Sequence, residues 1–245
     1  MFQRAIRHAD GEVIQIGAVP VRLMVSGRAR RISLRVDRAK GEVLAIAPSL
    51  RRLGEAAAFA RDRRAWIAER AAELQPPTRL APGLALSVFG EPCRLARSPG
   101  RASLEGPGWE RGIRLPAGAD DATFALAAVA LLRREARTWF ARRLAHHCAA
   151  LGVPVPRLTI SDTRTRWGSC TPGDKHRAAS IRLSWRLALA PPEVADYVAA
   201  HECAHLKEAN HGPKFWAISR RLVGDERPHR AWLRAEGAGL HAIGG

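Results

Sequence analysis

The sequence predicts an α+β protein, with a strand-rich N-terminal part that has one helix and a second part that has a small β-sheet and a histidine-bearing helix. Short apolar runs between turn-prone glycines fill residues 12–47 and predict strands. Apolar residues then recur at steps of three and four over 55–74 and 120–151, which indicates helices. A third helical stretch begins near Pro191 and contains two histidines four residues apart.

Composition sets broad limits on this fold. The 245 residues are 47% hydrophobic and 26% charged, so the chain can bury a core. No run approaches the ~18 apolar residues that a membrane-spanning helix needs, and the N-terminus has no apolar signal segment. We therefore expect no membrane contact and no secretion. None of the four cysteines forms a Cys-x-x-Cys pair, which favours reduced thiols in a cytoplasmic protein.

The formal net charge is +17, from 40 Lys and Arg residues against 23 Asp and Glu residues. Such an arginine-rich surface suits contact with DNA or a nucleotide. Only Lys40, Lys175, Lys207 and Lys214 are lysines, however. The arginines can equally record a GC-rich genome that uses arginine wherever a basic residue is tolerated, and we favour that explanation. Charge alone therefore defines no activity.

The N-terminal part, residues 1–80, is expected to hold four strands and one helix. Apolar residues alternate strictly with Arg or Ser over 31–36, which is typical of a strand with one buried face. The helix over 55–74 has an arginine-rich face that we interpret as solvated. The strands are expected at 12–16, 19–25, 32–36 and 43–47.

We expect residues 81–118, which are punctuated by Gly and Pro, to form a connecting β segment, and residues 119–245 to form the part with the histidine helix. Asp120 supplies an N-cap for the helix over 120–151, which ends at Gly152. A polar loop is expected between the last two strands, and no internal repeat is expected. The strands of both parts are predicted at 84–89, 93–96, 113–115, 157–163 and 179–185.

The histidine helix carries the sequence His-Glu-Cys-Ala-His over 201–205. Residues four apart share one face of a helix, so the imidazoles of His201 and His205 can reach one metal ion. Glu202 can then take a proton from a metal-bound water. His211 follows where Gly212-Pro213 should break the helix, and a turn there can bring it back to the ion. These residues predict a Zn²⁺ site with three histidine ligands and an open position.

Polar residues around this motif have two interpretations. Asp196 can accept a hydrogen bond from a ligand imidazole, or it can pair with an arginine. The stretch 163–171 can supply Arg166 to position a substrate, or it can be a structural hairpin with Trp167 in the core. Cys203 points away from the imidazoles and is expected in the core.

The other histidines are expected to take no part in the metal site. His146 and His147 lie in an Ala- and Arg-rich helix, where surface or packing roles are typical. His8 and His241 lie near the ends of the chain, where disorder is expected.

At these motifs the sequence resembles the YgjP-like metal-dependent hydrolases, which are relatives of the SprT-like and WLM zinc metallopeptidases. The similar segments are RTRWGSC at 164–170, LSWRL at 183–187, HECAHL at 201–206 and NHGPKFW at 210–216, and the resemblance spans about 20–236. It implies a zincin-like catalytic domain and zinc held by His201, His205 and His211. It also implies that Glu202 is the general base and that the protein is bacterial and cytoplasmic.

The expected activity is that of a metallopeptidase acting on a peptide or protein. A zinc-activated water attacks the carbonyl carbon, Glu202 transfers the proton, and Arg166 helps to stabilise the oxyanion. Two alternatives stay open. The arginines suit a nucleoside triphosphate substrate. The SprT-like resemblance also fits a DNA-associated module with structural zinc, although no fourth Cys or His ligand is evident near His211.

Overall fold

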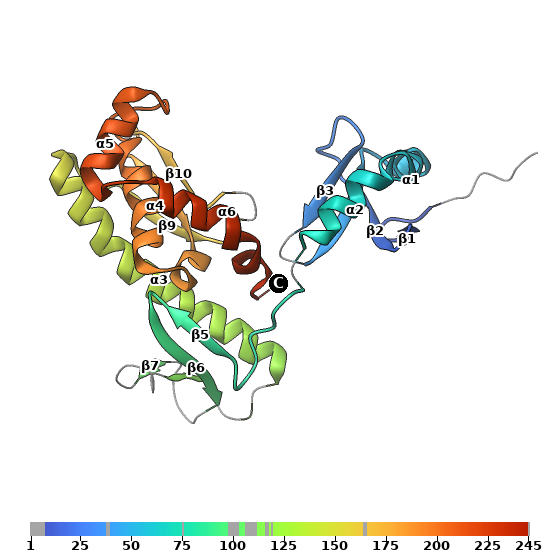
Figure 1. Cartoon of the computed structure of the whole chain (residues 1–245), viewed down its shortest axis with the longest axis horizontal. Helices are drawn as coiled ribbons and strands as arrows, with labels where there is room; N and C mark the ends of the chain where they lie inside the picture. The colour runs from blue at the N-terminus through green and yellow to red at the C-terminus, as the bar shows by residue number, and fades with distance from the viewer. Residues whose placement is uncertain are drawn as a thin grey trace, which may run out of the picture. The chain divides into compact units, whose positions relative to one another are not determined.

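The computed structural model describes residues 8–37, 40–74, 76–97, 103–105, 112–115, 118, 120–163 and 166–244. The chain forms two compact units, Met1–Thr78 and Arg79–Gly244 (Figure 1). Both units combine helices with small sheets, so the predicted α+β class is confirmed. The finer division into 1–80, 81–118 and 119–245 stays a prediction.

The first unit is a four-stranded sheet covered by helices. Its strand order is β1-β2-β4-β3, in which β2 and β4 are parallel and the other pairs are antiparallel. The strands β1 and β3 are therefore the edges. The elements are β1 (Val13–Ile16), β2 (Val19–Val25), β3 (Ser33–Asp37), β4 (Glu42–Ala47), the 3-10 helix η1 (Leu50–Arg52), α1 (Leu53–Asp62) and α2 (Arg64–Ala72).

Small side chains let α1 pack closely against β2 and β4. Ala56 and Ala60 are fully buried, in one core with Val21 and Val43. The single helix expected over 55–74 is interrupted at Arg63, where φ is −102° and ψ is 24°. Because residues 61–64 are all charged, this segment has no apolar side chain to hold it on the sheet. The helix α2 therefore starts in a new direction.

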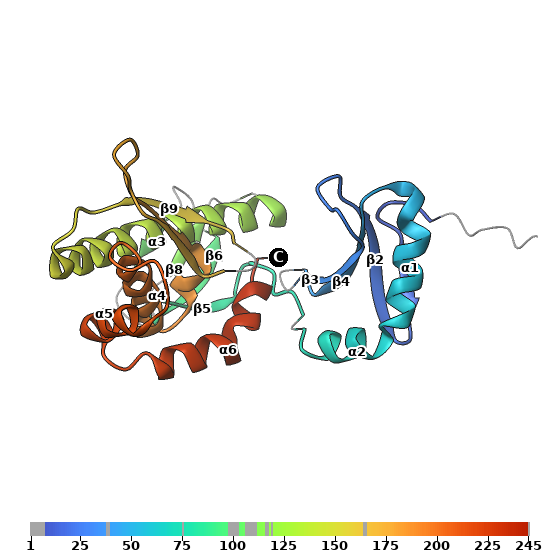
Figure 2. The ribbon, with the colours of Figure 1, turned by 90° about the horizontal axis from the view of Figure 1, so that it is seen from above.

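The second unit contains two sheets and most of the helices (Figures 1 and 2). One sheet has the order β5-β6-β8-β7, and the other has the order β10-β11-β9. The strands are β5 (Ala85–Val88), β6 (Glu91–Arg97), β7 (Ser103–Glu105), β8 (Gly112–Leu115), β9 (Arg157–Ser161), β10 (Gly168–Thr171) and β11 (Ser180–Ser184). The helices are α3 (Asp121–Leu151), the 3-10 helix η3 (Trp185–Leu189), α4 (Pro192–Ala204), α5 (Pro213–Val223) and α6 (Arg227–Ala242).

The long helix α3 begins and ends where the sequence predicts. The Asp120 carboxylate accepts a hydrogen bond from the Thr123 backbone N–H at 2.7 Å, which caps the first turn. Gly152 ends the helix in the left-handed conformation, with a φ of 61°. Between these caps, Phe140 and Leu144 are fully buried in the core that α3 shares with α4 and the strand β11.

The polar loop expected between β9 and β11 contains the additional strand β10. This strand pairs antiparallel with β11, which itself lies parallel to β9. Its residues, Gly-Ser-Cys-Thr, have no apolar alternation, so the sequence pattern does not reveal it. Residues 164 and 165 of the same motif lie outside the described residues.

The two four-stranded sheets have the same topology and the same register, although no repeat is expected from the sequence. In the first hairpin of each sheet, Gln15 pairs with Pro20 and Ser87 pairs with Pro92. The later strands correspond as well, because Leu34 pairs with Ala45 and Leu104 pairs with Ile113. Only short matches remain in the sequence, such as Pro-Val-Arg-Leu at 20–23 and Pro-Cys-Arg-Leu at 92–95. The structure therefore contains one strand arrangement twice.

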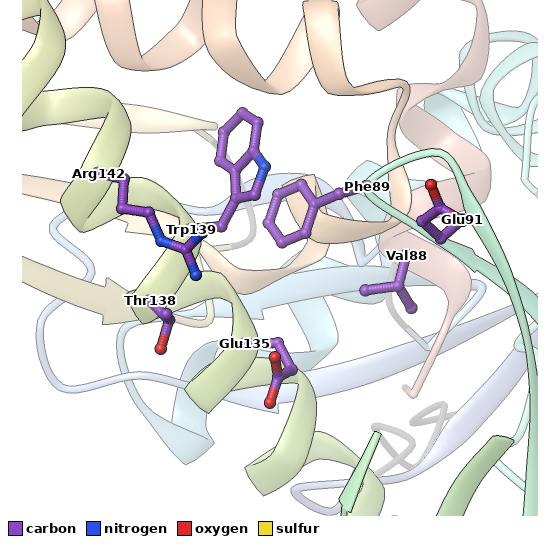
Figure 3. A pocket seen from close by; sticks show the side chains of 7 residues that line it. All are labelled: Val88, Phe89, Glu91, Glu135, Thr138, Trp139 and Arg142. Carbon is purple, nitrogen blue, oxygen red and sulfur yellow. The ribbon is translucent and has the colours of Figure 1, made fainter. Parts of the chain in front are cut away.

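The hairpin β5–β6 holds the start of the histidine helix against α3. Phe89 stacks on Trp139 of α3 with ring centroids 4.3 Å apart, beside a pocket of about 320 Å³ (Figure 3). The adjacent Gly90 has a φ of +84°, and an added Cβ would lie 3.1 Å from the Pro192 side chain. The turn therefore needs a glycine both for its backbone conformation and for its close approach to the first turn of α4.

Candidate metal centre

The helix α4 is buried on nearly every side, which fixes the direction of its polar residues. Pro192 occupies its first turn, as the sequence predicts. Val194, Ala199 and Cys203 are buried in the core of the unit. The helix ends at Ala204, so His201 lies in the last turn and His205 is the C-cap residue.

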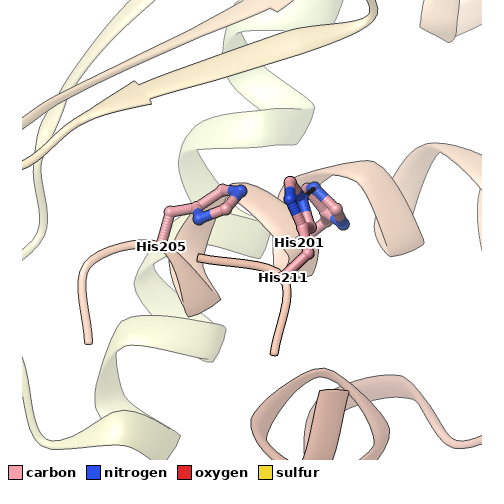
Figure 4. Close-up of side chains that lie close together, drawn as sticks. All are labelled: His201, His205 and His211. Carbon is pink, nitrogen blue, oxygen red and sulfur yellow. Dashed lines mark hydrogen bonds between the residues drawn. The ribbon is translucent and has the colours of Figure 1, made fainter. Parts of the chain in front are cut away.

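The structure brings His201, His205 and His211 together. Their ligand nitrogens all lie within 4.8 Å of one another, and His211 Nε2 is 3.0 Å from His201 Nε2. Figure 4 shows the three rings directed into a common space. His211 precedes α5, and the chain turns back between the two helices to place it there. The turn expected from the Gly212-Pro213 pair is therefore present.

This histidine cluster fits a four-coordinate metal ion. Metal–nitrogen bonds of about 2.0–2.1 Å separate tetrahedral ligands by roughly 3.4 Å, which small side-chain rotations can produce here. Burial, reinforced by the imidazoles of His205 and His211, lowers the pKa of His201 to about 3. Burial likewise lowers the pKa of His205. Both imidazoles are therefore neutral near pH 7, as metal binding requires.

Two further groups orient the ligand imidazoles. The Nδ1 of His205 lies 3.1 Å from the Glu208 carbonyl oxygen, to which it can donate a hydrogen bond. The Nδ1 of His201 lies 3.4 Å from the Tyr197 hydroxyl. Such bonds to Nδ1 direct Nε2 toward the ion. Tyr197 is not among the residues predicted from the sequence. Its position four residues before His201, on the same face of the helix, could have indicated it.

The Glu202 carboxylate is buried next to the cluster and has a perturbed pKa. Its residue is 6% exposed. Burial raises the pKa of Glu202 to about 7, against the opposing effects of the Arg166 charge and of a hydrogen bond from the Cys170 backbone N–H. At neutral pH the carboxyl group can thus both accept and release a proton.

Gly168 of β10 makes room for Glu202. A Cβ on this residue would lie 2.6 Å from Glu202 Oε1 and 2.8 Å from Glu202 Cγ. Gly168 does not have a positive φ. The requirement for glycine at this position therefore comes from its close approach to the carboxylate.

These residues line one cleft of about 460 Å³ between β10 and α4. Arg166 lies at its wall, so the structure brings this predicted residue to the same site as Glu202 and the histidines. Trp167 points elsewhere and stacks on His241 of α6 with ring centroids 4.4 Å apart. The lining residues are Arg166, Gly168, Ser169, Cys170, Pro172, His201, Glu202, His205, Ala209 and His211.

Asp196 pairs with residues of α3. Both of its carboxylate oxygens accept hydrogen bonds of 2.6 Å from Arg143, and His147 Nε2 lies 2.7 Å from Asp196 Oδ1. Burial raises the pKa of Asp196, but the hydrogen bonds of His147 and Arg143 outweigh it and lower the pKa to about 2. Of the two interpretations of Asp196, the structure supports the arginine pair. His147 is fully buried, so it packs in the core in addition to contacting Asp196.

Of the remaining predicted residues, Cys203 and His241 are buried, whereas His8 is half-buried. Cys203 is fully buried, with its Sγ 3.9 Å from Cys148 Sγ, as expected for a core residue. The expectation that His241 is disordered is wrong, because this residue is 7% exposed and packs on Trp167. The helix α6 provides this order by burying Gly237 and Leu240 as well. His8 is also ordered, with Nδ1 3.0 Å from Glu12 Oε1.

Comparison with protein families agrees with the geometry of the site. The family model of the YgjP-like metallopeptidase domain matches residues 30–236. The chain belongs to the YgjP-like family. Comparisons with curated proteins and with solved structures give no match.

Membership of the YgjP-like family supports a metal-dependent hydrolase and implies a divalent metal, commonly zinc. A metallopeptidase domain also suggests a peptide or protein substrate, whereas it gives no support for DNA contact. Among the described helices, none has the length and apolar character needed to cross a bilayer.

Proposed function

We propose that this YgjP-like chain is a zinc metallopeptidase with Glu202 as the general base. The observation that carries the proposal is the position of a buried carboxyl group beside three convergent histidines in one open cleft. This combination supplies neutral ligands, a proton acceptor and space for a substrate.

In this proposal His201, His205 and His211 hold the ion through their imidazole nitrogens. A zinc ion at this position lowers the pKa of water and polarises a carbonyl group. The described residues offer three histidine ligands in the cluster and no fourth Cys, His, Asp or Glu. Because structural zinc sites normally have four protein ligands, this set supports a catalytic site over a structural one.

The chain's own residues then perform the proton transfers and stabilise charge. Glu202, with a pKa near 7, accepts a proton from the attacking water and returns it to the leaving amine. Arg166 carries a positive charge at the wall of the cleft and stabilises negative charge on the substrate oxygen. Gly168 allows Glu202 to stay at the cleft floor.

The strand β10 favours a peptide substrate. It is an edge strand of its sheet, and three of its residues, Gly168, Ser169 and Cys170, line the cleft. An extended peptide can add to such an edge through main-chain hydrogen bonds. A nucleoside triphosphate would need several cations, whereas among the described lining residues only Arg166 has a permanent positive charge.

A substitution at Glu202 tests the proposal. We expect Glu202→Gln to bind about one equivalent of zinc and to lose peptide hydrolysis, since the amide cannot accept the proton. We expect His211→Ala to lose both zinc and activity. The measurements are metal analysis and turnover with a panel of peptides and nucleoside triphosphates. Turnover retained by Glu202→Gln, or equal zinc content in His211→Ala, would overturn the assignment.

A further inference from the structure

The first unit also contains a concave surface, which lies between the edge strand β3 and the break that separates α1 from α2. We call it the β3 groove. Its volume is about 340 Å³, and it is lined by Arg31, Ile32, Ser33, Leu34, Phe59, Arg63 and Trp66. The groove exists because α1 packs on β2 and β4, and because the helix changes direction at Arg63.

The floor of the β3 groove is apolar and incompletely covered. Ile32, Leu34, Phe59 and Trp66 are all half-buried, whereas the neighbouring strand β4 has fully buried side chains at Val43 and Ala45. The edge position explains the difference, because β3 has a strand on one side only. A partner that covers these four side chains would remove their apolar surface from water, which favours binding.

The rim of the β3 groove is positively charged. Arg31 and Arg63 are both exposed, and neither has an acidic partner within the described part of the chain. The Arg63 guanidinium lies over the Phe59 ring, 5.5 Å from its centroid, which keeps the cation at the groove. Two unpaired guanidinium groups beside apolar surface are complementary to a ligand that is both acidic and apolar.

We propose that the β3 groove binds an extended acidic peptide segment, which adds to the sheet as a fifth strand next to β3. In an antiparallel pair, every second residue of β3 directs its N–H and C=O groups away from β4, so the outer edge offers main-chain hydrogen bonds. Apolar side chains on one face of the peptide cover Ile32, Leu34 and Trp66. Glu or Asp residues next to them pair with Arg31 and Arg63.

The edge strand favours a peptide over a nucleic acid. A peptide strand matches both features of the groove, since it supplies main-chain partners for β3 and alternating side chains for the apolar floor. A nucleic acid would use the arginines and the two aromatic rings, but it would leave the edge of β3 unpaired. The proposal concerns the first unit alone and does not depend on the metal centre.

The experiment measures fluorescence anisotropy with the full chain and a short labelled peptide in which Glu alternates with Val. The test variant is Arg31→Glu/Arg63→Glu. The matched control is Arg61→Glu/Arg64→Glu, which makes the same change of charge at exposed residues of the same unit outside the groove. A second peptide of the same sequence, N-methylated at alternate amides, removes strand pairing without changing charge.

We expect the test variant to weaken binding at least about tenfold and the control to change it less than about twofold. We also expect the N-methylated peptide to bind poorly, and β3 amides to gain hydrogen-exchange protection with the unmodified peptide. Equal losses in the two variants, or unchanged binding of the N-methylated peptide, would overturn the proposal. A single-stranded oligonucleotide that binds more tightly, with the loss confined to the test variant, would instead identify a nucleic-acid site.

Discussion

Gly168→Ala tests whether the position of Glu202 is set by close contact with β10. The new Cβ would lie 2.6 Å from Glu202 Oε1, whereas ordinary contacts begin near 3.4 Å. The carboxylate must therefore retreat by about 0.8 Å. A displacement of about 1 Å at a reacting group can cost about 100-fold in rate. We expect kcat/KM for a peptide substrate to fall by about that factor, with the histidine ligands unchanged.

The assay compares kcat/KM, zinc content and thermal unfolding in wild type, Gly168→Ala and the control Gly239→Ala. An added Cβ at Gly239 in α6 meets no atom within 4 Å, so this control should keep its activity and gain up to about 1 kcal/mol of stability. Gly168→Ala should keep about one equivalent of zinc. Activity within about twofold of wild type, or loss of zinc together with activity, would refute the reasoning.

Three further substitutions test the energetics of the second unit. In metal-free protein at pH 8, Glu202→Gln should raise the free energy of unfolding by about 3 kcal/mol, because burial raises the pKa of Glu202 from 4.5 to about 7 and the folded state resists ionisation. Urea unfolding should show this gain shrinking toward pH 4.5, and a pH-independent difference would contradict it. Asp196→Asn should cost about 2 kcal/mol at pH 7, since the paired carboxylate has its pKa lowered from 3.8 to about 2. The cost should persist above pH 4 and decline as pH falls toward 2, whereas a cost that stays constant down to pH 2 would exclude this pairing. Gly237→Ala should lower stability by about 1–3 kcal/mol in thermal unfolding, because its Cβ would lie 2.9 Å from Trp167 Cζ2, and an unchanged melting temperature would argue against the contact.

Elements with strong local signals could be predicted from the sequence. The helix α3 has a capping Asp120 and a terminating Gly152, and both act as expected. The first four strands also appear close to their predicted positions. The strand β10 has no such signal, because its pairing with β11 depends on main-chain contacts rather than on apolar alternation. The helix break at Arg63 likewise depends on tertiary packing, because the charged residues 61–64 do not pack on the sheet.

In the candidate site, too, the local features could be predicted from the sequence and the contacts between distant segments could not. The spacing of His201 and His205 on one helix predicts that they lie close together, and the Gly-Pro pair after His211 predicts the turn. Contacts with residues of other helices and strands have no such signal in the neighbouring sequence. Nothing near Asp196 in the sequence indicates Arg143 and His147, which lie about 50 positions earlier and meet it only when α3 packs on α4. The contact of Gly168 with Glu202 also depends on tertiary packing.

The repeated strand arrangement has a consequence for folding. Because the two sheets have the same register, a strand of one can compete for the partner of the corresponding strand in the other. For example, β1 could pair with β6 instead of β2 during folding. Such misassembly between similar modules is a characteristic failure of repeat proteins. The divergence of the two copies works against it, since β2 begins with the apolar Val19 whereas β6 begins with the charged Glu91 at the corresponding position. Because the two sheets share a backbone arrangement but differ in sequence, we expect each hairpin to pair within its own sheet.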